Sequence, residues 1–332
     1  MKQIVLGLMF LLGTAQSLWA LDQVNSDLYE HAQSYQPDTI VLAELVPYLI
    51  GATANERQKA EILYYWIAQN INYDVESAIS GSYLTSTQDI LLSKAGVCED
   101  YAKLYQQMAA FAGLECYFVQ GYAKGFGPAD AIGLQSVNHS WNIVKVDGQY
   151  LFLDATWGSG RVAKIEGVYQ YQAKLSLQYI LDSPHKMLKT HLPADPIWQM
   201  TEWPIDMKAF REAANTYYLN SSAERPYPFT DKLCFYKRLN QDGQAIVSYT
   251  RAYHFHPTEQ NLEELILSYQ HAGYALLNGE FDEKRIYRGV LFYKRSAQLI
   301  QYHQGQTSRS SQLLADAEQA LSYGNYRLNK RL

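Results

Sequence analysis

The stretch that decides the fold of this chain starts at residue 96 and reads Gly96-Val97-Cys98-Glu99-Asp100-Tyr101-Ala102. Mostly apolar residues recur from there at three- and four-residue spacing, as on one face of a helix: Ala102, Tyr105, Met108, Ala109 and Ala112. Gly113 stands where such a helix would end. The spacing therefore predicts a helix over about residues 98–112, with the cysteine in its first turn.

The start of a helix is a suitable place for a reactive cysteine. Unpaired backbone N–H groups and the positive end of the helix dipole favour the thiolate there, and the thiolate is the nucleophile. A free cysteine also serves as a small buried apolar residue, so Cys98 alone does not decide between packing and chemistry. A cysteine nucleophile further needs a base within hydrogen-bond reach and a group that orients the base.

A predicted hairpin supplies both groups. Asp147-Gly148 separates two strand-like runs, 138–146 and 149–156, which is a strong hairpin signal. If the loop has two residues, His139 and Asp154 point to the same face of the sheet as diagonal neighbours. A loop of three residues would place them on opposite faces. The hairpin therefore predicts an imidazole oriented by a carboxylate.

Further elements are expected on both sides of these motifs. We expect a helix over 55–70 capped by Asn55, a loop over 74–86, a strand over 115–123, another strand over 177–181, and no regular structure over 191–203. Residues 206–220 look helical and residues 221–230 read as a linker, so that 206–230 separates the two expected domains. Beyond them, helical patterns joined by short turns cover about 242–254, 258–278, 282–303 and 308–328.

Composition excludes several classes of protein. The chain has 332 residues, 48% hydrophobic and 18% charged, which is typical of globular domains rather than disordered segments. Its net charge of −5 comes without a basic patch, so we expect no nucleic-acid partner.

The first residues, MKQIVLGLMFLLGTAQSLWALDQ, have the pattern of a secretory signal peptide. Lys2 precedes an apolar run over residues 4–12, and cleavage sites follow after Ala20 or after Ser17. This apolar run is too short to span a bilayer well, which favours a cleaved signal peptide. The alternative is that the segment stays uncleaved as a membrane anchor. We therefore expect an exported protein, periplasmic or extracellular, with no membrane span after the signal is removed.

The chain has three cysteines: Cys98, Cys116 and Cys234. Three is too few for a dense disulfide framework, so the fold relies on its core. Either all three are free, or one pair forms and one cysteine is left over. A pair between Cys116 and Cys234 would leave Cys98 free as a nucleophile.

Several motifs in the right order resemble the transglutaminase-like superfamily. They are Trp66-Ile67-Ala68-Gln69-Asn70-Ile71-Asn72-Tyr73-Asp74, Gly-Val-Cys at 96–98 with Tyr101-Ala102, Asn-His-Ser-Trp-Asn at 138–142, and Asp-Ala-Thr-Trp at 154–157. The segments 178–181 and 191–199 resemble the kyphoscoliosis-peptidase branch in particular. The resemblance covers about residues 40–200.

The resemblance implies an α+β fold with a papain-like transglutaminase core, in which the nucleophile helix packs on an antiparallel sheet. It implies Cys98 as nucleophile, His139 as general base and then acid, and Asp154 as the orienting carboxylate. The implied chemistry is acyl transfer from an amide through a thioester that water or an amine resolves. The N–H of Cys98 is one donor to the oxyanion. For a second donor, Gln88 and Trp66 carry suitable N–H groups.

We therefore expect four segments along the chain. They are a signal peptide over 1–20, a transglutaminase-like catalytic domain over 21–205, a linker over 206–230, and a helical C-terminal domain over 231–332. Helical-hairpin repeats are possible in the last of these, although no clean repeat of about 34 residues is visible. We expect no cofactor and no metal, since no acidic loop has calcium-ligand spacing.

The favoured function is an exported cysteine enzyme that hydrolyses or transfers amide or peptide acyl groups of a protein or peptide substrate. Hydrolysis is favoured over cross-linking because water is abundant outside the cell. The alternative is a non-catalytic binding or scaffold protein that uses the papain-like core and the C-terminal helices for a protein partner.

Overall fold

The computed structural model describes residues 25–35, 41–51, 55–81, 86–125, 134–212, 225–303 and 306–330, and the statements below concern these residues. The expected signal peptide, 1–20, lies outside them, as does the middle of the expected linker, 213–224. Among the described residues, no helix combines the length and hydrophobicity needed to cross a bilayer.

The described chain divides into two units, each made of two segments of sequence. One unit contains Met1–Val119 and His139–Met187, and the other contains Gln120–Asn138 and Leu188–Leu332. This division differs from the expected boundaries at 205 and 231, because residues within 120–125, 134–138 and 188–212 pack with the C-terminal helices. One hydrophobic core of the second unit, for example, joins Tyr122, Leu192, Phe210 and Ala252.

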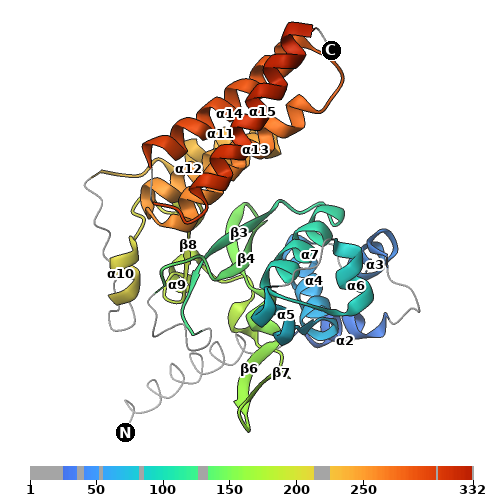
Figure 1. Ribbon diagram of the computed structural model, residues 1–332. Helices are drawn as coiled ribbons and strands as arrows, with labels where there is room; N and C mark the ends of the chain where they lie inside the picture. Colours follow the sequence, from blue (N-terminus) through green and yellow to red (C-terminus); the bar gives the residue numbers. More distant parts are fainter. Residues whose placement is uncertain are drawn as a thin grey trace, which may run out of the picture. The chain divides into compact units, whose positions relative to one another are not determined.

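The first unit contains most of the mixed α and β structure (Figure 1). Its helices are α2 (Ser26–Ser34), α3 (Leu42–Ile50), α4 (Glu56–Asn70), α5 (Val75–Ser80), α6 (Thr87–Ser93), α7 (Cys98–Phe111), α8 (Ala155–Ser159), α9 (Pro184–Met187) and the 3-10 helix η2 (Leu177–Tyr179). Its strands are β1 (Asn72–Tyr73), β2 (Ala95–Gly96), β4 (His139–Val146), β5 (Gln149–Leu153), β6 (Gly160–Ile165) and β7 (Val168–Ala173). Strand β3 (Cys116–Ala123) is divided between the two units after Val119.

The main sheet has the strand order β5-β4-β3-β8. Strands β4 and β5 are antiparallel, with Val146 opposite Gln149 and Asn142 opposite Leu153, so the predicted two-residue loop at Asp147-Gly148 is confirmed. Parallel strands β1 and β2 form a short second sheet, and the hairpin β6–β7 forms a third. This combination of a nucleophile helix with an antiparallel sheet and further helices is the expected α+β class.

Helices α4 and α7 form the helical core of the first unit. Asn55 caps α4 as expected, and its side chain accepts a hydrogen bond from the N–H of Gln58 at 2.8 Å. Residues 62–68 of α4 are all buried. On α7, the predicted apolar face is buried throughout, and Gly113 follows with φ of 74°, a left-handed conformation that favours glycine.

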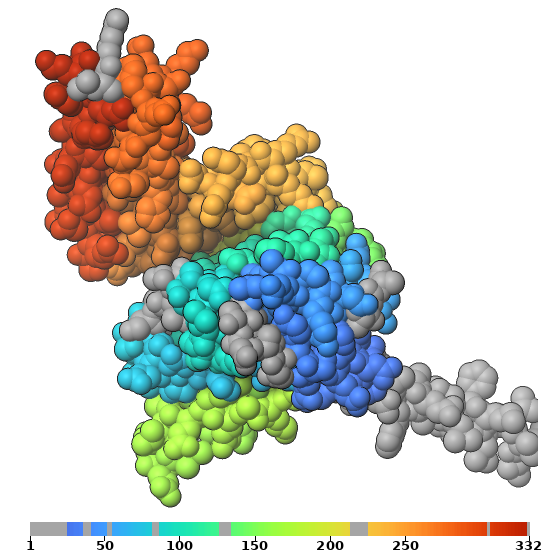
Figure 2. Space-filling model, turned by 90° about the vertical axis from the view of Figure 1, so that its right-hand side faces the viewer, coloured from blue at the N-terminus to red at the C-terminus, as the bar shows by residue number. Residues whose placement is uncertain are grey.

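The second unit is largely helical. It contains β8 (His191–Pro193), the 3-10 helix η3 (Pro196–Gln199), α10 (Met207–Glu212), α11 (Phe229–Lys237), α12 (Gln241–Phe255), α13 (Glu259–Leu277), α14 (Glu283–Tyr302) and α15 (Ser310–Lys330). The four long helices lie within three residues of their predicted bounds. Each packs against the next one along the chain, and these helices appear in orange to red in Figure 2.

Several local expectations were wrong. The expected loop over 74–86 contains α5, capped by Asp74, and the expected strand over 177–181 is the 3-10 helix η2. Residues 191–203 contain β8 and η3 rather than irregular chain. The hairpin β6–β7 was not predicted. The helix expected over 206–220 is present as α10 within its described part, but α11 begins before the expected end of the linker at 230.

Candidate active site

The first turn of α7 presents Cys98 as the first residue of the helix. Val97 precedes it in extended conformation, and its N–H donates to Oδ2 of Asp100 at 2.9 Å. A Cβ at Gly96 would lie 2.7 Å from the Cβ of Asp100, so the glycine leaves room for this carboxylate. The thiol of Cys98 is free and its residue is partly exposed. The helix start is therefore closed on one side by Asp100 and open to a reactant at Cys98.

Asp154 lies at the end of the hairpin rather than within it. Strand β5 ends at Leu153, one residue earlier, and the predicted continuation of the strand to residue 156 was wrong. The reason is local: Oδ1 of Asp154 accepts hydrogen bonds from the N–H groups of Thr156 at 2.9 Å and Trp157 at 3.1 Å. This carboxylate caps α8, and the cap turns the chain from strand to helix.

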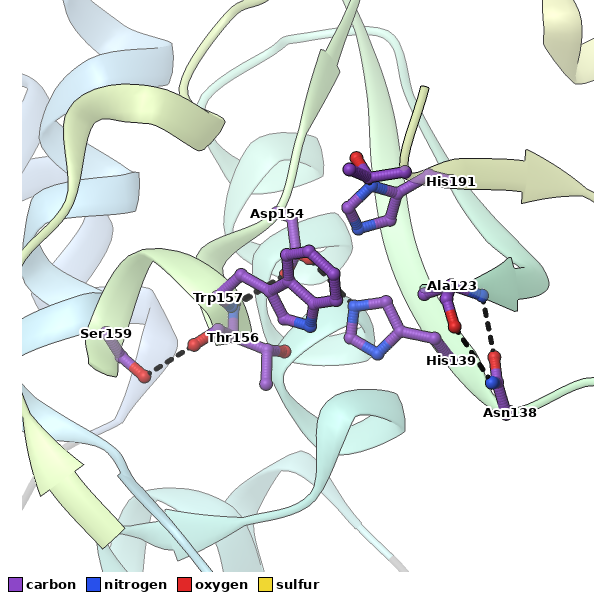
Figure 3. Close-up of polar contacts among 9 residues, drawn as sticks. Ala123, Asn138, His139, Asp154, Thr156, Trp157, Ser159 and His191 are labelled. Carbon is purple, nitrogen blue, oxygen red and sulfur yellow. Dashed lines mark hydrogen bonds and ion pairs between the residues drawn. The ribbon is translucent and has the colours of Figure 1, made fainter. Parts of the chain in front are cut away.

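The other oxygen of Asp154 faces His139, the first residue of β4. Nε2 of His139 lies 2.7 Å from Oδ2 of Asp154. Figure 3 shows the two side chains facing each other. His139 is 2% exposed and Asp154 is fully buried. With one oxygen held by backbone N–H groups and the other by the imidazole, the carboxylate has a single fixed orientation.

The environment of His139 favours its protonated form. Burial lowers its pKa, but the charge of Asp154 and the hydrogen bond to it raise the pKa, as do a hydrogen bond and charge interaction with Cys98. The net effect raises the pKa of His139 to about 10. Since Nε2 faces Asp154, Nδ1 is the ring nitrogen that remains for Cys98. The structure therefore brings Cys98, His139 and Asp154 together.

Two tryptophans flank the imidazole. The ring of Trp141 stacks on His139 with centroids 5.9 Å apart, and the ring of Trp157 lies 5.5 Å away at 36°. Trp141 is 1% exposed, whereas Trp157 is half-buried and meets Tyr179 edge-on at 5.3 Å. These rings restrict the imidazole and exclude water from one side of it.

Side chains that were not singled out from the sequence hold α7 in place. Nδ2 of Asn142 donates to the carbonyl of Ala102 on α7 at 2.9 Å and to the carbonyl of Tyr117 on β3 at 3.3 Å. The hydroxyl of Tyr101 donates to the carbonyl of Ile71 at 2.5 Å, and Ser159 of α8 donates to that hydroxyl at 3.3 Å. Tyr101 and Asn142 belong to the motifs quoted above. Their membership of these motifs was the sequence signal that could have identified them as supports of α7.

Asn138 fixes the chain immediately before His139. Its side chain exchanges two hydrogen bonds with the backbone of Ala123, accepting from the N–H at 2.7 Å and donating to the carbonyl at 3.0 Å (Figure 3). The amide thus replaces a backbone pair where β4 begins.

The remaining sequence candidates lie elsewhere. Trp66 is 1% exposed in the core of the first unit, which argues against a donor role toward a substrate, and Gln88 is exposed on α6. All three cysteines are free, so Cys116 and Cys234 form no pair. Burial raises the pKa of the Cys116 thiol, which keeps this thiol protonated at neutral pH.

A metal site is not built within the first unit taken alone. His139 and Asp154 bind each other, and among the described residues of that unit no third histidine, cysteine or carboxylate lies within 4.8 Å of both.

Comparison with known proteins agrees with this geometry. The chain is 30% identical to kyphoscoliosis peptidase of Mus musculus over 174 residues, covering 52% of this chain and 26% of that protein. It is also 30% identical to the human protein over 179 residues, with 53% and 26% covered, and 24% identical to hillarin of Drosophila melanogaster over 191 residues, with 53% and 22% covered. The matched part thus spans about a quarter of the length of these curated relatives.

Solved structures include two similar chains. One is the crystal structure of a proposed cysteine protease from Cytophaga hutchinsonii, 22% identical, with a TM-score of 0.30 and coverage of 46% of this chain and 47% of that one. The other is described as a TGase, 17% identical, with a TM-score of 0.27 and coverage of 51% and 40%. The family model that matches is that of the transglutaminase-like superfamily, over residues 43–155. That span includes Cys98, His139 and Asp154, and this part of the chain is similar to transglutaminase-like domains and to the kyphoscoliosis peptidases.

Proposed function

We propose that this protein is a cysteine enzyme that hydrolyses or transfers the acyl group of an amide through a thioester on Cys98. The observation that supports it best is the buried His139–Asp154 pair at 2.7 Å, with Cys98 interacting with the same imidazole from the first residue of a helix. A buried charged pair is tolerated only when its polar atoms have partners. A thiol placed beside the imidazole can give its proton to that base and so become a nucleophile.

In the proposed mechanism, Nδ1 of His139 accepts the proton of the Cys98 thiol. The raised pKa of His139 favours this transfer and gives an imidazolium beside a thiolate. The thiolate attacks the carbonyl carbon of the amide, and the charge that develops on the oxygen meets the N–H groups at the start of α7. His139 then protonates the leaving amine, the C–N bond breaks and the thioester remains.

The second half of the reaction uses the same residues in the reverse roles. His139, now neutral, takes a proton from water or from an amine, which attacks the thioester carbonyl. The C–S bond breaks, and the proton returns to the sulfur. Asp154 stays ionised and keeps the proton of Nε2 in place, so that Nδ1 always faces the sulfur. We propose hydrolysis as the main outcome, on a protein or peptide substrate.

Alkylation by iodoacetamide tests the proposed nucleophile. Cys98 is expected to react faster than Cys234, which is exposed, and the His139→Ala variant is expected to lower the Cys98 rate about thirtyfold at pH 7, because only a few per cent of an ordinary thiol is ionised there. Cys234→Ala is the matched control and leaves the Cys98 rate unchanged. Equal rates for Cys98 in wild type and His139→Ala would contradict the proposal and favour a binding or scaffold role.

A peptide library incubated with a labelled amine distinguishes the possible products. Cleaved peptides indicate hydrolysis, labelled peptides indicate transfer to the amine, and both should disappear in Cys98→Ala. Products that persist in Cys98→Ala would remove this residue from the proposed mechanism.

We also propose that the protein is exported, on the basis of the N-terminal pattern Lys2 followed by the apolar run over residues 4–12. Mass spectrometry of the protein recovered from its native compartment is expected to show a mature chain that begins at residue 21 or residue 18. An intact N-terminus on protein found inside the cell would contradict this proposal.

A further inference from the structure

Helix α14 of the second unit exposes an unusual combination of residues. One side of it packs against α13 and α15 through Ile286, Val290, Tyr293 and Ile300, which are buried. The outward side carries Tyr287, Arg288, Leu291, Lys294, Arg295 and Tyr302, all exposed, which we call the α14 stripe. At 100° per residue these six side chains lie within about one third of the helix circumference.

Among the described residues, the cations of the α14 stripe have no acidic partner. Within the part of the chain that the structure describes, neither an ion pair nor a hydrogen bond engages the side chains of Arg288, Lys294 and Arg295. The acidic residue of α14, Glu283, lies in its first turn, beside the capping Asp282. Two exposed lysines elsewhere do have acidic partners: Lys103 pairs with Glu99 at 2.6 Å and Lys186 with Asp182 at 2.6 Å. The positive charge of this stripe is therefore left for a partner.

Large apolar and aromatic groups alternate with these cations. Tyr287 is 53% exposed, Leu291 44% and Tyr302 84%. An isolated exposed hydrophobic residue needs no explanation, but three on one helix face among three cations form a continuous surface. Tyrosine, leucine, arginine and lysine on one face are the composition of helices that lie in the headgroup region of a membrane. In that region the tyrosine hydroxyls remain hydrated, while the tyrosine rings and Leu291 contact the upper part of the acyl chains. The cationic groups bind the lipid phosphates.

We propose that the α14 stripe docks the protein on the surface of an anionic phospholipid bilayer. The argument is charge complementarity: the whole chain carries a net charge of −5, which repels such a surface, whereas this face carries three cations without compensating acids. A purely polyanionic partner would use the cations but would leave Leu291 and the tyrosine rings in water. The cations and the apolar side chains together fit a bilayer, which has negatively charged headgroups at its surface and acyl chains below them.

Sedimentation of the full chain with vesicles tests the proposal. We expect binding to phosphatidylglycerol vesicles, weaker binding to phosphatidylcholine vesicles, and loss of most of the difference at 0.5 M salt. Each cation near such a surface contributes about fivefold in partition, so the charge-reversal variant R288E/K294E/R295E should lower binding by at least a hundredfold. The N-terminal apolar run over residues 4–12 is the same in all proteins compared, so it does not contribute to the difference.

Two further variants separate the causes. The triple variant R161E/K164E/K174E makes the same charge change at exposed positions on and just after the hairpin β6–β7, and it should keep more than half of the binding. Y287S/L291S removes the apolar component and should weaken binding several-fold while increasing its sensitivity to salt. Equal losses in the two triple variants would overturn the proposal, since binding would then follow net charge. Binding to heparin that survives Y287S/L291S unchanged, with no preference for vesicles, would also overturn it in favour of a soluble polyanion.

Discussion

Asp154 uses its two oxygens for different purposes. Oδ1 caps the short helix α8, and Oδ2 binds the imidazole of His139 at 2.7 Å. A residue that fixes both a turn of the chain and an ionisable group cannot be replaced without consequences for both. The two effects can be separated experimentally, because asparagine keeps the acceptor for the cap but loses the charge.

The variant Asp154→Asn is expected to lower the pKa of His139. Burial opposes the imidazolium, and the charge of Asp154 is the largest influence that raises the pKa against it. NMR titration of the His139 ring should show the lower pKa directly, and acyl transfer should slow by about 10²–10⁴-fold. His254→Gln, an exposed position on α12, is the control and should leave the titration unchanged.

The same charge predicts a pH dependence of stability. The pKa of His139 is raised in the folded chain, so its protonated form contributes stability fully below about pH 6.5, the ordinary histidine value, and loses it as the pH rises through about 10. In urea unfolding experiments, wild type should therefore lose its advantage over Asp154→Asn between these two pH values. An advantage that grows with pH would mean that His139 is neutral in the folded protein.

Gly158 is expected to tolerate no side chain. A Cβ there would lie 1.8 Å from the hydroxyl oxygen of Tyr64, which donates to the carbonyl of Ser176 at 2.5 Å. Gly158→Ala should lower the free energy of unfolding by about 1–3 kcal/mol through overpacking, measured by urea denaturation. Gly113→Ala provides a contrast, because nothing lies within 4 Å of its Cβ and only its φ of 74° is unfavourable.

At the scale of elements, the N-terminus of α7 lacks the Ser, Thr, Asp or Asn that commonly occupies the N-cap position. Val97 occupies the N-cap position without a polar side chain, and the carboxylate of Asp100 compensates by accepting the Val97 N–H. Asp100 is only 2% exposed, so this bond is shielded from water. The position of Cys98 at the helix start depends on it.

Removing this cap is expected to destabilise the protein and to displace Cys98. Asp100→Ala leaves the Val97 N–H buried without its acceptor, which should cost about 1–3 kcal/mol of unfolding free energy and slow alkylation of Cys98. Glu99→Ala is the neighbouring control. It breaks the exposed Glu99–Lys103 pair and should cost less than about 1 kcal/mol, without an effect on alkylation.

The elements that could be predicted are those defined by local sequence. The loop Asp147-Gly148 gave the register of β4 and β5, and Asn55 and Gly113 marked the ends of two helices because caps and turns are encoded within a few residues. The short elements α5, β8 and η2 were missed because three to six residues carry little periodicity. Asp154 was placed on the correct side, but its role as a helix cap was not visible, since alternation alone suggested a longer strand.

At the scale of the whole molecule, the second unit is held together by a buried ion pair between distant segments. Asp195, just after β8, accepts hydrogen bonds from Nε of Arg251 at 2.8 Å, Nη2 of Arg251 at 2.7 Å and the hydroxyl of Ser248 at 2.6 Å. The guanidinium also lies over the ring of Tyr236. No motif quoted from the sequence joins Asp195 to Arg251, so neither this contact nor the division into units could be predicted.

Breaking this ion pair should be costly, and removing both charges less so. Arg251→Met leaves the Asp195 carboxylate buried without its partner and should cost about 3–5 kcal/mol of unfolding free energy. Adding Asp195→Asn to it should recover part of the loss, as measured by a double-mutant cycle in urea. The control Arg309→Met breaks the long 3.9 Å pair between the exposed Arg309 and the partly buried Glu263, and it should cost clearly less than Arg251→Met.

The threading of the chain through its two units has a genetic consequence. A premature stop after residue 205 would preserve the codons for Cys98, His139 and Asp154, yet it would delete Gln260, Asn261 and Arg251. Those residues hold Val137, Tyr122 and Asp195, which belong to the segments that remain. A shortened allele would thus encode the candidate catalytic residues together with segments of the second unit that have lost these partners.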